Sequence, residues 1–237
     1  MNTMNSWIGT SGFQYPEWKG GFYPEKMPLA KMLGYYAERF PTTEINYTFR
    51  QIPKETTVAK WVEGTPEHFR FTFKAPQKVT HFSKLRECGD TMRYFHEVMA
   101  GLGEKRGAVL LQLPPNFQKD VEVLAAFLGD LPEGMRAAFE FRDESWFTDE
   151  VYDLLRKHNA ALCLAESGDL VTPREVTADF GYLRLRREDY TDKELAERAE
   201  FVKRQAARWS DVFIYFKHEE RGVGPVFAEE MQRLLGK

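Results

Sequence analysis

The chain has 237 residues, of which 43% are hydrophobic and 29% are charged, values typical of a soluble globular protein. This length favours one large α/β domain over residues 1–237 rather than two small ones. Lys and Arg number 33 against 36 Asp and Glu, so the formal charge is −3. The composition therefore excludes a bulk basic field for nucleic acid, and only a local basic patch stays open.

The cysteines and the N-terminal segment indicate the cellular compartment in which we expect the protein. Cys88 and Cys163 lie far apart and form no C-x-x-C pair, so the sequence supports neither a disulfide framework nor a zinc ribbon. We find no apolar signal-peptide core and no apolar run long enough to span a bilayer. We therefore expect a cytoplasmic protein that does not associate with a membrane.

Short apolar or alternating segments alternate with helical patterns along the whole chain. The patterns predict strands at residues 7–10, 43–47, 69–74, 108–113, 136–142, 161–166, 181–186 and 212–217. They predict helices near residues 29–39, 54–63, 87–101, 119–128, 148–158, 193–208 and 225–235. The sixth connection, residues 167–180, has no helical pattern and is expected to be a loop.

Eight strands with intervening helices at this length indicate a (β/α)8 TIM-like barrel. Spacing alone does not show that the sheet closes, so an open doubly wound sheet is the alternative. Several predicted strands have one apolar face and one polar face, as where Phe71 and Phe73 alternate with Thr72 and Lys74. The apolar faces should meet the helices, so the polar faces should point into the barrel.

Charged side chains on those inner faces need partners or water, because each unpaired buried charge costs several kcal/mol. Since many lie at strand ends, we expect them at the wet mouth, where barrel enzymes keep their chemistry. A structural salt-bridge network is the alternative for any single residue. The expected catalytic residues are Glu44, Lys74, His81 and Glu140; the expected substrate contacts at strand ends are Asn46, Gln112, Arg142, Arg184 and Lys217.

Two loop features extend this candidate site. Gly222 and Gly224 precede Pro225 after the last strand, where the N-terminus of a helix commonly binds phosphate in barrels. Trp18, Tyr23 and Trp146 lie on loops after the first and fifth strands. These rings would either stack on a sugar or base or simply cover the rim of the barrel.

Signals for metals and cofactors are poor. The five histidines are dispersed, and the chain has no H-E-x-x-H, Walker A, G-x-S-x-G or Rossmann motif. Ser11 lies in a Gly-Thr-Ser-Gly turn without the spacing of a nucleophile elbow. We predict no cofactor and no metal ligands, although a divalent metal visiting Glu44, Glu140 and His81 is not excluded.

Several segments together resemble the YecE-like family, domain-of-unknown-function family 72. The first carries Gly9-Thr10-Ser11-Gly12-Phe13 and Phe22-Tyr23-Pro24. The others read Glu44-Ile45-Asn46-Tyr47-Thr48-Phe49, Phe71-Thr72-Phe73-Lys74 with His81, Leu111-Gln112-Leu113-Pro114-Pro115-Asn116-Phe117, Glu140-Phe141-Arg142 with Ser145-Trp146, Tyr182-Leu183-Arg184 and Tyr215-Phe216. The resemblance covers nearly the whole chain and implies a TIM-like barrel, but it supplies no activity.

Two positions depart from the family pattern. After Arg184 the family tends toward His-Gly, whereas this chain has Leu185-Arg186-Arg187. After Phe216 it tends toward Asn-Asn, whereas Lys217-His218 stand here. Both changes add positive charge near the last two strand ends, so we assign no ligand contact of the family to these positions.

The excess of Lys and Arg at the strand ends of an acidic chain favours an enzyme, a hydrolase or lyase, that acts on a small anionic, phosphate-bearing substrate. Glu and His side chains would then be the acid–base groups. A second hypothesis is a carbohydrate-active barrel with a Glu44/Glu140 carboxylate pair. A third is a non-catalytic module that binds nucleic acid or protein. The oligomeric state does not follow from the sequence.

Overall fold

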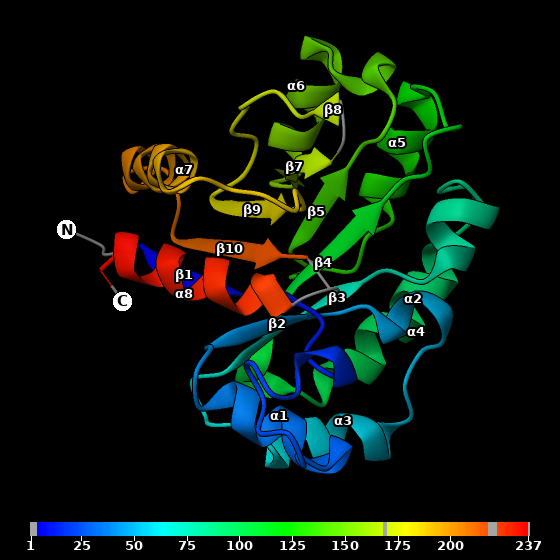
Figure 1. Cartoon of the computed structure of the whole chain (residues 1–237). Coiled ribbons are helices and arrows are strands. Elements are labelled where there is room, and N and C mark those ends of the chain that lie inside the picture. Colours follow the sequence, from blue (N-terminus) through cyan, green and yellow to red (C-terminus); the bar gives the residue numbers. More distant parts are fainter. Residues whose placement is uncertain (1–3, 168–169, 218–221, 237) are drawn as a thin grey trace.

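The computed structural model describes residues 4–167, 170–217 and 222–236. Its helices surround a central set of strands (Figure 1). The strands are β1 (Asn5–Ser11), β2 (Thr42–Ile45), β3 (Arg70–Lys74), β4 (Arg106–Gln112), β5 (Ala137–Glu140), β6 (Ala161–Leu162), β7 (Leu164–Ser167), β8 (Leu170–Val171), β9 (Phe180–Leu185) and β10 (Asp211–Phe216). The α-helices are α1 (Leu29–Ala37), α2 (Tyr47–Arg50), α3 (Glu55–Glu63), α4 (Gly89–Ala100), α5 (Val121–Gly129), α6 (Asp149–Lys157), α7 (Asp192–Arg204) and α8 (Val223–Leu234).

The sheet closes into a barrel through the segment that contains β6 and β7. The sheet order is β6-β5-β4-β3-β2-β1-β10-β9-β7-β8. β6 pairs in parallel with β5, and β7 pairs in parallel with β9. These two short strands are separated only by Cys163, whose N–H donates to the carbonyl of Phe139 at 2.8 Å. One continuous segment therefore joins both edges of the sheet, which confirms the predicted TIM-like barrel over an open sheet.

The second strand ends earlier than predicted. β2 stops at Ile45, and the short helix α2 begins at Tyr47. The hydroxyl of Thr48 donates to the carbonyls of Ile45 at 3.1 Å and Lys74 at 2.6 Å. These bonds turn the chain away from the extended conformation, so the predicted strand over residues 43–47 is wrong at its last two residues. The Lys78–Phe82 π-helix was also not predicted.

The sixth connection agrees with the prediction of a loop. After β7 the chain forms the short strand β8, which pairs with β7 antiparallel. Residues 172–179, all within the described part of the chain, contain no helix. The other helices cover the barrel close to their predicted ranges, and no described helix is long and apolar enough to cross a membrane.

Two buried layers confirm the alternation of the strands. The larger cluster lies between strands and helices and contains Phe71, Phe73 and Ile214. A smaller cluster includes Leu110, Cys163, Phe213 and Tyr215, which lie on the opposite strand faces. The inner layer is thus apolar with tyrosines, and it forms the floor beneath the charged residues at the carboxyl ends of the strands.

The first strand approaches the layer of helices unusually closely. A Cβ at Gly9 would lie 2.1 Å from the carbonyl oxygen of Thr42 and 2.7 Å from the hydroxyl of Tyr36. That hydroxyl accepts the backbone N–H of Thr10 at 2.7 Å and donates to the carbonyl of Thr42 at 3.0 Å. Glycine is therefore needed at position 9, and Tyr36 fixes the ends of β1 and β2 that carry Ser11 and Glu44.

Candidate functional site

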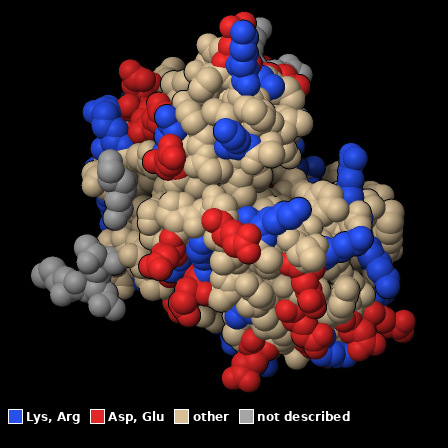
Figure 2. Space-filling view, turned by 90° about the horizontal axis from the view of Figure 1, so that it is seen from below, with Lys and Arg blue, Asp and Glu red and all other residues tan. Residues whose placement is uncertain are grey.

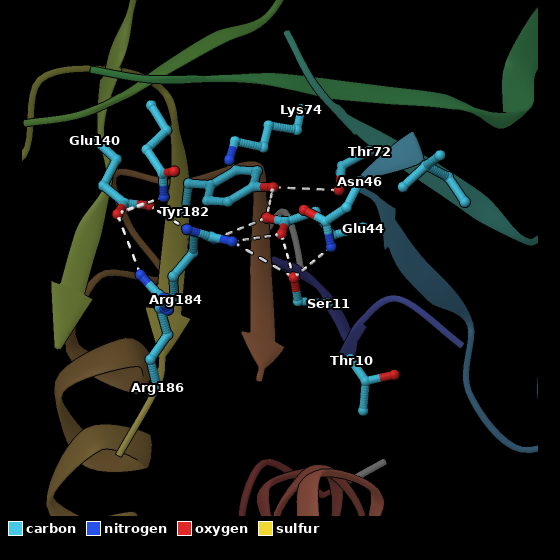
Figure 3. A network of polar contacts seen from close by, with 12 residues as sticks. Thr10, Ser11, Glu44, Asn46, Thr72, Lys74, Glu140, Tyr182, Arg184 and Arg186 are labelled. Carbon is cyan, nitrogen blue, oxygen red and sulfur yellow. Dashed lines mark hydrogen bonds and ion pairs between the residues drawn. The ribbon is translucent and has the colours of Figure 1, made fainter. Parts of the chain in front are cut away.

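The guanidinium of Arg184 lies at the centre of a buried polar network (Figure 3). Its Nε donates to Oε2 of Glu44 at 3.0 Å, and its Nη2 donates to Oε1 of Glu44 at 2.9 Å. Its Nη1 donates to Oε2 of Glu140. Arg184 is 2% exposed and the two glutamates are 0% and 1% exposed. One arginine therefore holds a carboxylate on each side, in the bidentate geometry that favours Arg over Lys.

The carboxylate of Glu44 has no acceptor site left over. Besides Arg184, Oε1 accepts the hydroxyl of Ser11 at 2.5 Å and Oε2 accepts the hydroxyl of Tyr182 at 2.6 Å. Asn46 in turn donates from Nδ2 to Oγ of Ser11 at 2.9 Å. A carboxylate offers about four lone-pair sites, and four donors occupy those of Glu44.

Glu140 makes a similar set of contacts nearer the mouth. Its Oε1 accepts Nε2 of Gln112 at 2.8 Å and Nε of Arg142 at 3.0 Å. Nη1 of Arg186 lies 3.8 Å from the same oxygen, too far for a hydrogen bond. The network thus draws side chains from the ends of five strands, β1, β2, β4, β5 and β9, as the closed barrel requires.

Both glutamates are held as anions. Burial would raise the pKa of Glu140, but the charges of Arg184 and Arg142 outweigh it and lower the pKa to about 2. Burial would likewise raise the pKa of Glu44, but Arg184 and the hydrogen bonds from Ser11 and Tyr182 lower it below the ordinary value. Neither group can donate a proton near neutral pH, so the predicted acid–base roles of Glu44 and Glu140 gain no support from the geometry.

Lys74, at the end of β3, is the titratable cation of the site. Its Nζ lies 3.8 Å from the centroid of the Phe49 ring. Its ammonium makes no hydrogen bond or ion pair to any described residue. Burial and the nearby charge of Arg184 lower the pKa of Lys74 to about 8, against the opposing effect of Glu44 and Glu140. A large fraction of Lys74 is therefore a neutral amine just above neutral pH.

His81 lies close to Lys74 because both contact the same ring. The rings of His81 and Phe49 meet edge to face with centroids 4.9 Å apart. Nδ1 of His81 is 2.9 Å from the hydroxyl of Thr80. Partial burial and the charges of Lys74 and Arg142 lower the pKa of His81, so its imidazole is neutral at pH 7.

The site carries an excess of positive charge. Four cations, Lys74, Arg142, Arg184 and Arg186, stand against the carboxylates of Glu44 and Glu140, an excess of two. Nε and Nη1 of Arg186 are buried and have no hydrogen-bond partner among the residues that the structure describes. Buried N–H groups of an arginine are costly to leave unpaired, so they are ready to bind an anion.

The aromatic residues predicted to stack on a ligand are buried instead. Trp146 is 0% exposed, stacks on Phe141 with centroids 4.7 Å apart, and donates from Nε1 to the carbonyl of Phe117 at 2.6 Å. Trp18 and Tyr23 are each 1% exposed and stack on each other with centroids 6.1 Å apart. These residues pack the loops and present no free face, so their expected stacking role is corrected to a structural one.

The structure does not bring Gly222 and Gly224 into the network. Gly222 has a left-handed backbone with φ of 63° at the start of α8, and a Cβ there would meet the indole of Trp18 at 3.6 Å. Gly224 is buried in the first turn of α8. Lys217 follows β10, and its backbone N–H donates to the carbonyl of Leu185 at 3.1 Å. His218, one of the departures from the family pattern, lies outside the described residues.

The sequence interpretation missed three members of the site: Ser11, Tyr182 and Phe49. Tyr182 shares a strand face with Arg184, so the alternation already placed the two side by side. Ser11 was considered only as a nucleophile, whereas it supports Glu44 by a hydrogen bond. Phe49 belongs to a segment that resembles the family, but its contact with Lys74 was not predicted because the ring is placed by the unpredicted helix α2.

Two further features of the site concern metal ligands and a neighbouring cavity. Among the described residues no group of three His, Cys, Asp or Glu side chains is arranged to hold a metal ion. Beside the network, at the ends of β1 and β2, lies a cavity of about 320 Å³. Asn46 belongs to the network and also lines this cavity. It is lined by Gly12, Phe13, Gln14, Tyr15, Ile45, Asn46, Tyr47, Thr57 and Trp61.

Comparison with known proteins places this geometry in a family. The family model described as "Protein of unknown function DUF72" matches residues 7–237. The UPF0759 protein YecE of Escherichia coli K12 is 32% identical over 142 residues, which are 60% of this chain and 50% of YecE. The UPF0759 protein YunF of Bacillus subtilis 168 is 32% identical over 149 residues, covering 55% of this chain and 49% of YunF. The chain thus spans about half the length of the curated relatives it matches.

Two solved structures share the fold. A DUF72-family protein of Thermotoga maritima MSB8 is 26% identical and superposes with a TM-score of 0.87, covering 98% of this chain and all of that one. A DUF72-family protein of Enterococcus faecalis V583 is 21% identical with a TM-score of 0.83, covering 98% of this chain and 96% of that one. Both superpositions agree with the barrel described above.

Proposed function

The chain belongs to the DUF72 family of proteins of unknown function, and from its site we propose that it is an enzyme acting on a small anionic, phosphate-bearing substrate at the mouth of the barrel. The observation that carries the proposal is Arg186, whose Nε and Nη1 are buried without a hydrogen-bond partner among the described residues and lie near the charge of Arg142. Phosphate oxygens accept charge-assisted hydrogen bonds from a guanidinium.

Proton transfer belongs to Lys74 and His81 in this proposal. Both have a lowered pKa, and both contact Phe49, so they can exchange protons near neutral pH beside a bound anion. The groups under them, Glu44, Glu140 and Arg184, keep fixed charges and hold the mouth in place. This division of roles is that of an active site in which the buried shell positions the reacting groups.

The two alternatives from the sequence fit the site less well. A two-carboxylate glycosidase needs one protonated acid and a free anion, whereas one arginine holds both glutamates ionised. A module for polyanions needs a broad basic surface. On the face shown in Figure 2, basic and acidic side chains are interspersed, so this face offers no such surface.

The test is stabilisation of the protein by inorganic phosphate and sulfate, measured as the shift in unfolding temperature over a range of concentrations. Phosphate at about 100 times its dissociation constant should add roughly 2.7 kcal/mol to the free energy of unfolding. Arg186→Gln should weaken phosphate binding about 10-fold or more, because it removes charge-assisted hydrogen bonds. The matched control is Arg93→Gln, which removes an exposed arginine on α4. Equal phosphate binding in Arg186→Gln and wild type, or no binding at all, would contradict the proposal.

A further inference from the structure

Lys74 differs from the three arginines of the site because no carboxylate of a described residue forms an ion pair with it. Two carboxylates, those of Glu44 and Glu140, influence it electrostatically, but Arg184 lies between them and takes up an oxygen of each. Ser11 and Tyr182 take up the remaining acceptor positions of Glu44, and Gln112 and Arg142 both donate to Oε1 of Glu140. Among the described residues no hydrogen bond or ion pair joins Lys74 to this network, so Lys74 can lose its proton without breaking an ion pair with them.

The surroundings of Lys74 favour the neutral amine. The charged and titratable groups that face it are Arg184 from β9, Glu44 from β2, Glu140 and Arg142 from the end of β5, and His81 from the π-helix. Its ammonium rests on the face of the Phe49 ring, 3.8 Å from the centroid. An anion contact alone would be served better by a third arginine, because a lysine with a labile proton is a weaker and less directional anion ligand.

We propose that Lys74 is a nucleophile that forms a Schiff base with a carbonyl group of the substrate, which is therefore a small aldehyde or ketone bearing a phosphate or similar anion. This inference rests on the proposed function, since Arg186 and Arg142 bind the anionic group. Beyond that function, it specifies that the substrate reacts through a carbonyl group and that Lys74 bonds covalently to it. Desolvated lysines next to a second cation are the standard amine nucleophiles of this kind.

The step balances with the groups present. The lone pair of Lys74 Nζ forms a bond to the carbonyl carbon, and the π-electron pair moves to the oxygen, which takes up a proton from the solvent. The nitrogen then loses a proton to His81, which is neutral at pH 7. The carbon–oxygen bond breaks with return of a proton to the oxygen, so that one water molecule leaves and a carbon–nitrogen double bond remains. No oxidant, reductant or metal is needed.

The neutral fraction of Lys74 differs from that of ordinary lysines by enough to measure. At pH 7.5 roughly a quarter of Lys74, with its pKa of about 8, is a neutral amine, against about one in a thousand for an exposed lysine. Imine formation with a ketone, which surface lysines form slowly, should therefore be selective for Lys74.

The experiment traps the imine with sodium cyanoborohydride in the presence of dihydroxyacetone phosphate, a small ketone that carries a phosphate. Adducts are counted by intact mass and located by peptide mapping. We expect one adduct, on Lys74, that forms at least about 10-fold faster than with uncharged dihydroxyacetone and is slowed by inorganic phosphate. The rate should rise with a midpoint near pH 8. Lys74→Arg should lose the adduct, whereas Lys203→Arg, which changes an exposed lysine on α7, should retain it.

The outcomes separate the two proposals. Phosphate binding that is lost in Arg186→Gln, together with adducts spread evenly over surface lysines, would overturn the Schiff base and leave the anion-binding enzyme standing. A Lys74 adduct formed equally fast with the charged and the uncharged ketone would overturn the anion-bearing substrate. The peptide map of the wild-type protein decides the site of reaction even if Lys74→Arg fails to fold.

Discussion

Arg184 and Glu44 form a buried bidentate ion pair across the inside of the barrel. Its two bonds are 3.0 and 2.9 Å long, and β1 and β10 separate the strands that carry the two residues. The same guanidinium binds Glu140 from the other side. The pair therefore links β2, β5 and β9 at one level of the barrel and supports the groups above it. Four predictions follow from this arrangement and from the packing around it.

Replacing Arg184 with Leu should destabilise the fold by about 3–5 kcal/mol, because two buried carboxylates would lose their counter-charge. Urea unfolding at pH 7 measures the change. Arg93→Leu on the surface of α4 is the control, and it should stay within about 0.5 kcal/mol of wild type. A loss below about 1 kcal/mol in Arg184→Leu would show that the network is not needed to hold the barrel.

Acid should lower the free energy of unfolding by protonating Glu140. Its folded pKa, about 2, is lower than the ordinary value of 4.5, so the unfolded chain binds the proton more tightly. The resulting stability, roughly 3 kcal/mol, is present above pH 4.5 and is lost as the pH falls toward 2. Urea unfolding between pH 6 and 2 should therefore show a steeper decline in wild type than in Glu140→Gln. Asp153→Asn, an exposed site on α6, should keep the wild-type slope.

Replacing Lys74 with Met should stabilise the protein near pH 7 by about 1–2 kcal/mol, because it removes a partly buried charge that lies near Arg184. The pKa of Lys74 is lowered to about 8 in the folded state, so the cost of its charge is full below pH 8. That cost disappears as the pH rises from 8 to 10.5, and the gain from the substitution should shrink over the same range. Thermal unfolding at pH 7 and pH 10 tests this, and a gain independent of pH would contradict it.

Trp146→Ala should cost about 3–5 kcal/mol, because the indole is fully buried and its N–H is bonded to Phe117. The same variant should not change the affinity for phosphate or for neutral sugars at temperatures where it stays folded. Unfolding in urea and the shift of melting temperature with ligand separate the two effects. A specific loss of sugar binding would restore the stacking role that the sequence had predicted for this residue.

The barrel followed from the sequence because its signals are local. Eight strand patterns, seven helix patterns and the alternation of Phe71 and Phe73 with Lys74 depend on near neighbours along the chain, and the structure confirmed them. The predicted end of the second strand was wrong because the turn after β2 depends on a hydrogen bond from Thr48 to the carbonyl of Lys74, which lies 26 residues away. The sequence left open whether Trp18 and Trp146 stack on a ligand or cover the rim, since packing across loops decides which rings are buried.

The sequence by itself determined which polar residues stand at the strand ends, among them Glu44, Lys74, Glu140 and Arg184, because the alternation of a strand fixes the face of each side chain. Only the tertiary structure decided how these charges pair. Closure of the barrel brings β2, β5 and β9 around one guanidinium, so Arg184 pairs with both glutamates and Lys74 forms no ion pair with a described carboxylate. Charge pairing depends on distances across the barrel, and those distances exist only once the sheet has closed.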